Sequence, residues 1–291
     1  MASTLPQIAM LPDGRRLHLQ HGPIDLIIEA FGVQQEVDAA YRQAREHFKM
    51  VLSELVKELE QLRRPAQEPR WKPVGPVAAR MVDAVWPHKN KYVTPMAAVA
   101  GSVADEMVGA LVDGRNLRKA YINNSGDIAI YLAPRQTLRL GIVGELSNPN
   151  LDGTVLLDYG SSVRGIATSG WDGRSLSLGI ADAVTVLSTN AAKADVAATL
   201  IANAVNADHP AVARRPASQI DDYTDLGERL VTVSVGELDP ITIGLALDAG
   251  TSVAQDMARR GLISGAALFL SGEYRVVGGF LQAIAGFGKC P

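Results

Sequence analysis

Within the first 62 residues, the spacing of hydrophobic side chains changes from every second residue to every third or fourth. This change limits the folds that the chain can adopt. Residues 16–30 alternate between apolar and polar side chains and then become mostly apolar, around a His-Gly-Pro turn. Such alternation predicts a pair of β-strands. Residues 37–62 carry apolar side chains at intervals of three and four, with lysine and glutamate on the other face. This spacing predicts a long amphipathic helix, so the chain mixes both element types.

Later segments continue the mixture of strands and separate helices. Residues 94–107 begin with Thr-Pro, which is a helix-start signal, and go on as a helix of small residues. We predict strands at residues 121–131 around a polar bend, and at 138–143, 154–157 and 182–188. A loop is predicted at 210–225, followed by strands within 230–247 that are broken at Asp239-Pro240. A helix at 252–260 and an apolar run at 266–280 complete the chain's predicted elements. The order favours an α+β fold, in a single domain over residues 1–291.

Composition excludes several classes of protein. The net charge of -3 gives no basic face for nucleic acid. A single cysteine, Cys290, excludes a disulfide framework, and the five histidines lack the helical spacing of zinc ligands. We see no secretory signal and no uninterrupted apolar run of about 18 residues, so we expect a cytoplasmic protein without a membrane partner.

Two segments of small and polar residues suggest a site for a phosphorylated ligand. Residues 165–170 (Gly-Ile-Ala-Thr-Ser-Gly) predict a tight turn whose amides and hydroxyls could surround a phosphate. Asp195 and Thr199 lie four residues apart in an alanine-rich helical segment, so both fall on one helix face. A carboxylate and a hydroxyl are hard oxygen ligands of the kind that magnesium prefers. Together the two segments favour a metal-assisted anion site.

Each of these signals has a structural alternative that the residues leave open. Residues 124–127 (Asn-Ser-Gly-Asp) could present amides and directional hydrogen bonds to a ligand, or form an ordinary β-turn. Asp195 could be an exposed first-turn residue favoured by the helix dipole, and Thr199 could bond back to a helix carbonyl. Arg174, after a Gly-Trp-Asp-Gly bend, could contact an anion or be an exposed loop arginine.

Five ordered blocks give the chain a family resemblance. They are residues 94–102 (TPMAAVAGS), 124–128 (NSGDI), 167–170 (ATSG), 174–183 (RSLSLGIADA) and 194–203 (ADVAATLIAN). At these residues the sequence resembles the FAD:protein FMN transferase (ApbE-like) superfamily, and within it a branch of shorter cytoplasmic proteins. The resemblance implies a T-fold-like α+β architecture of mixed and antiparallel sheets with packed helices. In this architecture FAD lies in a cleft beside Mg²⁺. Relative to that branch, residues 207–265 look like a lineage-specific elaboration.

The resemblance also implies roles for individual residues. Asp195, Thr199 and the backbone carbonyl of Ala167 would be the metal ligands. The nucleotide cleft would be lined by Asn124, Ser125, Gly126 and Asp127, with Thr168, Ser169 and Gly170 nearby. Asp127 and Arg174 are the candidate catalytic residues, on which any turnover is expected to depend.

The chain departs from the transferases between the Thr-Ser turn and the next strand. Residues 174–179 (RSLSLG) contain neither the histidine-rich strand nor the Asp-Pro-x-x-Gly loop of those enzymes. Arg174 stands where the shorter branch often has histidine, and Ser125 where it often has a second glycine. This departure bears on the FMN-transfer activity more than on the fold or on the binding of an anionic ligand.

Three functions therefore stay open. The first is an enzyme that binds a nucleotide or another anionic ligand with magnesium, with flavin-linked transfer as the family activity. The second is a hydrolase, lyase or sulfur-metabolism enzyme on the same scaffold, acting on a small anion that Arg174 would grip bidentately. The third is a non-catalytic binding protein, because no acid–base pair is recognisable. Small-residue helices and the apolar C-terminal run are compatible with a homodimer.

Overall fold

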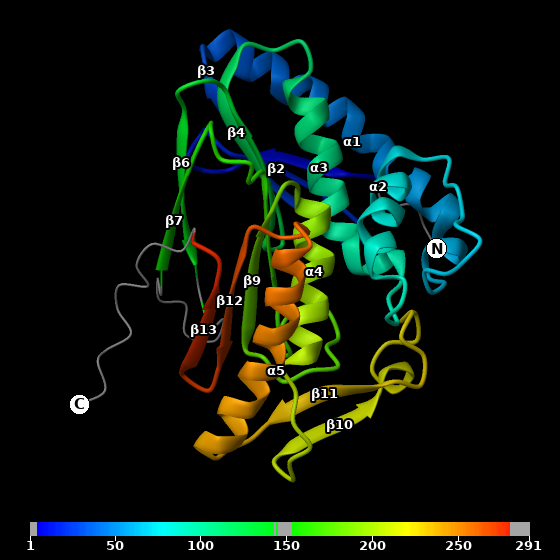
Figure 1. Ribbon diagram of the computed structural model, residues 1–291. Coiled ribbons are helices and arrows are strands. Elements are labelled where there is room, and N and C mark those ends of the chain that lie inside the picture. Colours follow the sequence, from blue (N-terminus) through cyan, green and yellow to red (C-terminus); the bar gives the residue numbers. More distant parts are fainter. Residues whose placement is uncertain (1–4, 143, 145–152, 280–291) are drawn as a thin grey trace. The chain divides into compact units, whose positions relative to one another are not determined.

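The computed structural model describes residues 5–142, 144 and 153–279, which divide into two compact units. The first unit comprises Met1–Leu138, Leu157–Ala167 and Thr189–Val196, and the second comprises Arg139–Leu156, Thr168–Ser188 and Ala197–Pro291. Strands and helices mix in both units, so the predicted α+β class is confirmed (Figure 1). The single domain over residues 1–291 and the elaboration over 207–265 stay predictions.

The sheet of the first unit is antiparallel. Its strands pair in the order β1-β2-β3-β4-β5-β8, and the part of β8 that pairs with β5 is Gly165–Ile166. The predicted strand pair around the His-Gly-Pro turn is confirmed as β2 and β3, and the predicted bend at residues 124–127 joins β4 to β5. The strands are β1 (Gln7–Met10), β2 (Leu17–His21), β3 (Ile24–Gly32), β4 (Leu117–Asn124), β5 (Asp127–Leu132) and β8 (Gly165–Ser169).

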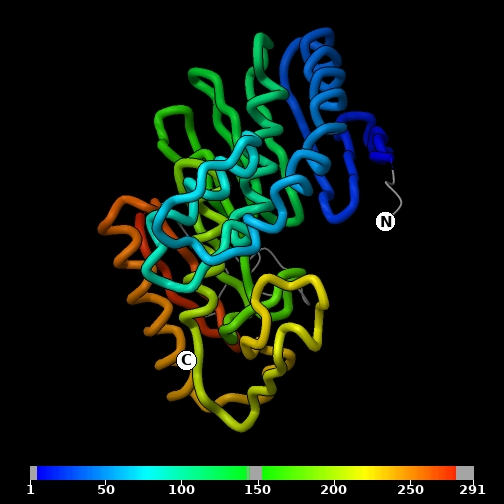
Figure 2. Tube along the Cα trace, turned by 90° about the vertical axis from the view of Figure 1, so that its right-hand side faces the viewer, coloured from blue at the N-terminus to red at the C-terminus, as the bar shows by residue number. Residues whose placement is uncertain are grey.

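Three helices build the core of the first unit. The predicted amphipathic helix is α1 (Gln34–Leu62), which buries Tyr41, Ala44 and Phe48 at helical spacing and runs beside β2 and β3 (Figure 2). The Thr-Pro start is confirmed, because the Thr94 side chain accepts a hydrogen bond from Met96 N at 3.2 Å before the short helix η2 (Pro95–Ala98) and α3 (Val99–Val112). Helix α3 packs on α1, on α2 (Pro76–Val85) and on β4 and β5.

The second unit contains three paired strands and a long helix. Strands β9 (Ala183–Ser188), β12 (Gly265–Leu270) and β13 (Glu273–Val277) are antiparallel, and β9 and β12 are buried along their whole length. Helix α5 (Pro240–Arg259) packs on β12 and β13 (Figure 1). Two further two-stranded sheets pair β10 (Val212–Pro216) with β11 (Leu230–Val235), and β6 (Thr137–Ile142) with β7 (Gly153–Asp158).

Two predictions about residues 210–260 are wrong. The segment predicted as a loop contains strand β10, which pairs with β11 across a β-bulge. The segment after Asp239-Pro240, predicted as strand, is the start of α5. Asp239 is the N-cap of that helix, since its Oδ1 accepts the amides of Ile241 and Thr242, both at 3.0 Å, and Pro240 occupies the first helical position. An Asp-Pro pair therefore starts a helix here, as capping rules allow.

One helical stretch is long and apolar enough by composition to cross a membrane. It spans Pro95–Val112, and half of its window is buried inside the protein. Because α3 packs on two helices and two strands, we interpret it as a core helix. Val143, at the end of a predicted strand, Phe280, at the end of the apolar run, and Cys290 lie outside the described residues.

Candidate functional site

Residues 124–127 form a two-residue hairpin turn between β4 and β5. Asn124 pairs with Asp127 across the turn, and both are buried. Ser125 and Gly126 have φ values of 56° and 111°, the positive angles that a tight hairpin of the I′ kind requires. The turn interpretation is thus confirmed. Serine in this conformation is unusual, because the left-handed region favours glycine.

The Asn124 side chain connects the hairpin to the start of α3. Its Nδ2 donates to the carbonyl oxygen of Ala100 at 3.0 Å. Asp195, in α4 (Ala191–Ala204), reaches the next residue of the same helix, because its Oδ2 accepts the amide of Gly101 at 2.9 Å. Two predicted site residues that are 71 positions apart (124 and 195) therefore contact adjacent residues at one helix start.

Asp195 is not the exposed first-turn residue of the structural alternative. Its side chain is half-buried and accepts amides of Gly101 and Ala100 in the first turn of a neighbouring helix. Such amides have no partner within their own helix, and a carboxylate satisfies them well. Asp195 thus has a structural role that sequence reasoning did not foresee.

Asp105 makes the equivalent contact in the opposite direction, from α3 to the first residues of α4. Its Oδ1 accepts the amide of Ala191 and its Oδ2 the amide of Ala192, both at 2.9 Å. Sequence reasoning missed this residue. The available signal was the Asp105-Glu106 pair within a helix of small apolar residues, since a carboxylate on a buried helix needs partners, but nothing local identifies those partners. The two helices therefore cap each other reciprocally.

Two glycines allow this close approach. A Cβ on Gly101 would lie 2.3 Å from the carbonyl oxygen of Ala191, and one on Gly165 would lie 1.9 Å from the carbonyl carbon of Asn190. Both contacts are with backbone atoms and are shorter than any side chain tolerates. The small residues expected to let a helix approach closely are therefore required at the junction of α3, α4 and β8.

Burial perturbs the two carboxylates of this junction. Desolvation raises the pKa of Asp195 to about 7, against the opposing effect of the Gly101 and Ala100 amides, and the nearby Asp105 carboxylate adds to the rise. Desolvation likewise raises the pKa of Asp105, although the Ala192 and Ala191 amides favour its ionised form. Desolvation is thus the largest cause of both shifts, and the Asp105 charge adds to the rise only at Asp195.

The remaining predicted metal ligands fit hard-oxygen chemistry. Thr199 lies one helical turn after Asp195 in α4, and its hydroxyl makes no hydrogen bond to any described residue. Thr251 in α5, by contrast, bonds back to the Leu247 carbonyl at 2.7 Å, which is the structural alternative considered for Thr199. Ala167 is buried in β8. No group of three or more His, Cys, Asp or Glu side chains suited to a metal occurs in the described part of the chain.

The tight turn predicted at residues 165–170 is wrong, because Gly165–Ser169 form strand β8, whose first residues pair with β5. The residues after Ala167 belong to the second unit. Thr168 Oγ1 lies 2.9 Å from Thr185 Oγ1, so this hydroxyl already has a partner on β9. Ser169 is half-buried at the end of β8. A Cβ on Gly170 would lie 2.2 Å from the Asp182 carbonyl oxygen, so this glycine is required by packing. Arg174 is exposed on the following loop, which agrees with its structural alternative.

Comparison with known proteins identifies the family. Residues 8–276 match the model of a family described as AbpE bacteria. The chain belongs to this family. The predicted resemblance to ApbE-like proteins is thereby confirmed, and every candidate site residue of this AbpE family member lies within the matched range.

Relatives and solved structures accompany the AbpE match. A UPF0280 protein from Methanothermobacter thermautotrophicus is 36% identical over 196 residues, which are 64% of this chain and 73% of the relative. A UPF0280 protein from Methanothrix thermoacetophila is 32% identical over 196 residues, or 63% and 80% of the two chains. The crystal structure of the ApbE protein from Thermotoga maritima aligns with 96% of this chain and 99% of its own at 11% identity and a TM-score of 0.47. A mutant of the flavin transferase ApbE from Vibrio cholerae aligns with 94% and 96% at 11% identity and a TM-score of 0.43.

Proposed function

We propose that this AbpE family member binds a phosphorylated nucleotide together with Mg²⁺, and that flavin-linked transfer is its activity, with FAD as the nucleotide. The observation that carries the proposal is the meeting of Asn124 and Asp195 at Ala100 and Gly101. It joins the polar hairpin of the predicted nucleotide cleft to the predicted metal ligand within the first unit.

Asp195, Thr199 and the Ala167 carbonyl would hold the metal. An ionised carboxylate offers about four lone-pair sites, and the two amides at Asp195 use only part of this capacity. The unbonded hydroxyl of Thr199 supplies a second oxygen on the same helix. When bound, Mg²⁺ would polarise a phosphate oxygen and stabilise negative charge on the leaving phosphate.

The hairpin residues would orient the nucleotide. The positive φ angles of Ser125 and Gly126 form a tight turn, and the Gly126 amide donates to Asn123 Oδ1 at 2.7 Å, which holds the turn in the conformation proposed for binding. Asn124 and Asp127 are held in place by cross-strand pairing, so little order would be lost on binding. The nucleotide contacts of Thr168, Ser169 and Gly170, and the catalytic roles of Asp127 and Arg174, stay predictions from the sequence.

Thermal unfolding with FAD, FMN or ATP, each with and without Mg²⁺, tests the proposal. A ligand at about 100 times its dissociation constant stabilises the folded state by roughly 2.7 kcal/mol, so modest affinity is detectable. We expect a Mg²⁺-dependent rise of the midpoint with FAD. Midpoints that do not respond to any nucleotide with Mg²⁺ would contradict the proposal and direct the search to small carboxylates and sulfur metabolites.

Two threonines provide a matched pair of variants. Thr199→Val keeps the side-chain shape and removes a hydroxyl that bonds to none of the described residues, so we expect normal stability and a lost Mg²⁺ response. Thr251→Val removes the bond to Leu247 and should reduce stability slightly while keeping the Mg²⁺ response. Asp195→Asn is preferable to alanine at the metal position, because asparagine can still accept the Gly101 amide. An equal Mg²⁺ response in both threonine variants would exclude Thr199 as a ligand.

A further inference from the structure

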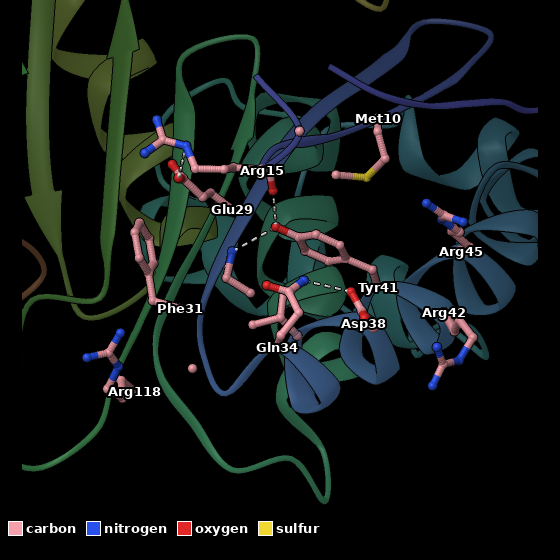
Figure 3. Close-up of a pocket in the computed structure, with 14 residues that line it drawn as sticks. Met10, Arg15, Glu29, Phe31, Gln34, Asp38, Tyr41, Arg42, Arg45 and Arg118 are labelled. Carbon is pink, nitrogen blue, oxygen red and sulfur yellow. Dashed lines mark hydrogen bonds and ion pairs between the residues drawn. The ribbon is translucent and has the colours of Figure 1, made fainter. Parts of the chain in front are cut away.

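A pocket of the first unit, away from the proposed nucleotide site, is lined by several positively charged side chains. Its volume is about 580 Å³, and its walls come from the turn between β1 and β2, from β3, from the beginning of α1 and from the beginning of β4 (Figure 3). Four arginines and only two carboxylates line it, in a protein whose net charge is -3. These charged residues are Arg15, Arg42, Arg45, Arg118, Glu29 and Asp38.

Both carboxylates of the pocket are already hydrogen-bonded. Glu29 is buried, and its Oε2 accepts the hydroxyl of Tyr121 at 2.7 Å, while Arg15 Nε lies 3.8 Å from its Oε1. Asp38 accepts the side-chain amide of Gln34 at 2.9 Å. These contacts leave most of the arginine charge uncompensated.

Three of the arginines have no side-chain partner among the residues that the structure describes. Arg42, Arg45 and Arg118 make no ion pair or side-chain hydrogen bond with any residue that the structure describes. The Nε atom of Arg45 is buried and unsatisfied. A buried donor without a partner destabilises the folded protein, because it has lost its hydrogen bonds to water without replacement. Such a group is expected where a ligand supplies the missing acceptor.

Hydrogen bonds within the protein hold the walls of the pocket in place before any ligand binds. The Tyr41 hydroxyl donates to the Arg15 carbonyl at 2.6 Å and accepts the amide of Ala30 at 3.1 Å, so one α1 side chain ties together the turn and β3. Asp13 accepts the amides of Arg15 and Arg16 at 2.9 and 3.0 Å, which orders the turn further. A preorganised pocket loses little conformational entropy on binding.

Arg118 is placed by an irregularity of the sheet. In the pairing of β3 with β4, Phe31 lies opposite Lys119 and Gly32 opposite Leu117, so Arg118 is the extra residue of a β-bulge. Bulges redirect a side chain and occur often beside functional sites. The bulge is at one end of β4 and Asn124 at the other, about 20 Å away at the usual rise of a strand. The pocket is thus separate from the proposed nucleotide site.

We propose that this pocket binds a polyanion with at least two linked phosphoryl groups. Figure 3 shows Arg42 and Arg45 on one side of Tyr41, and Arg15 and Arg118 on the other, so the positive charges are spread along the pocket. A guanidinium binds phosphate oxygens bidentately, which suits a ligand whose charges are spread along a chain. Inorganic polyphosphate and the phosphate chain of a nucleotide share this chemistry.

Calorimetric titration with inorganic tripolyphosphate tests the proposal. The buffer is free of divalent metal and of low ionic strength, so the result is independent of the proposed magnesium site. We expect saturable binding by the full chain, weakened about tenfold or more in the double variant Arg42→Gln/Arg45→Gln. The control is Arg64→Gln, which removes an arginine paired with Glu60 beyond the far end of α1 and should change affinity less than about twofold.

The outcomes separate a ligand site from a structural role. Arg45→Gln should leave the ligand-free melting temperature unchanged or raised, because it replaces an unsatisfied donor. Arg45→Lys should keep the positive charge but bind tripolyphosphate more weakly, because lysine lacks the bidentate guanidinium fork. Tighter binding of ATP than of tripolyphosphate identifies a nucleotide source, and the reverse identifies free polyphosphate. Absent binding, equal affinity for citrate, or an unaffected double variant would each overturn the proposal.

Discussion

Replacing Gly101 with alanine should strongly destabilise the first unit. The added Cβ would lie 2.3 Å from the Ala191 carbonyl oxygen and 2.8 Å from the Ala192 amide nitrogen, so α3 and α4 must separate. Overpacking of this kind costs roughly 1–3 kcal/mol. The shift would also weaken the hydrogen bond from Gly101 to the Asp195 carboxylate, worth roughly 1.5–3 kcal/mol. Alanine regains about 1 kcal/mol of helix propensity, which leaves a net loss of roughly 2–4 kcal/mol.

Gly109→Ala is the matched control for this prediction. Gly109 is an exposed residue of the same helix, and no atom lies within 4 Å of its hypothetical Cβ. The control should therefore gain up to about 1 kcal/mol from helix propensity. Urea unfolding followed by circular dichroism measures both variants against the wild type. The reasoning is refuted if Gly101→Ala is as stable as Gly109→Ala.

Three further substitutions test other parts of the structure. Ser125→Gly removes a side chain from a residue with φ of 56° and should stabilise the protein by about 1 kcal/mol, whereas a lower melting temperature would contradict the strain. Asp239→Ala removes the N-cap of α5 and should cost about 1 kcal/mol in urea unfolding; an unchanged midpoint would show that the cap is unimportant. Asp195 has a pKa of about 7 in the folded protein, above its unfolded value, so the folded state holds its proton more tightly. The resulting stability is complete below about pH 4 and is lost as pH rises to about 7, by roughly 1–4 kcal/mol. The difference between wild type and Asp195→Asn at pH 5 and pH 8 should show this loss, and an equal difference at both pH values would exclude it.

Local patterns in the sequence predict much of the fold. The period of two before residue 30 and the helical period after residue 37 correspond to β2, β3 and α1, because burial of one face imposes both periods. The Asn-Ser-Gly-Asp turn is also local, since Gly126 supplies the positive φ that the hairpin needs. The start of α5 was missed because Asp-Pro can end a strand or cap a helix, and only the following residues decide between them.

Contacts between distant segments are not visible in local patterns. Asp105 and Asp195 meet the ends of each other's helices only after α3 and α4 have packed, and neither spacing nor composition indicates this pairing. The arginine pocket combines residues of a turn, a helix and a bulged strand in the same way. Single arginines in exposed segments predict only solvated charge, and their shared cavity exists only in the folded chain.

The two carboxylates between α3 and α4 differ in a way that bears on metal binding. Asp105 is buried, and each of its two oxygens accepts one amide, so its hydrogen bonds leave it committed to holding α4. Asp195 is only half-buried and precedes by one turn a threonine hydroxyl without a partner. A metal ligand must give up its proton, and a pKa near 7 places that loss within the physiological range. Desolvation makes the ionised form of Asp195 unfavourable in the free protein. The same desolvation would strengthen the attraction between the Asp195 carboxylate and Mg²⁺. One residue can therefore serve both helix capping and the proposed metal site.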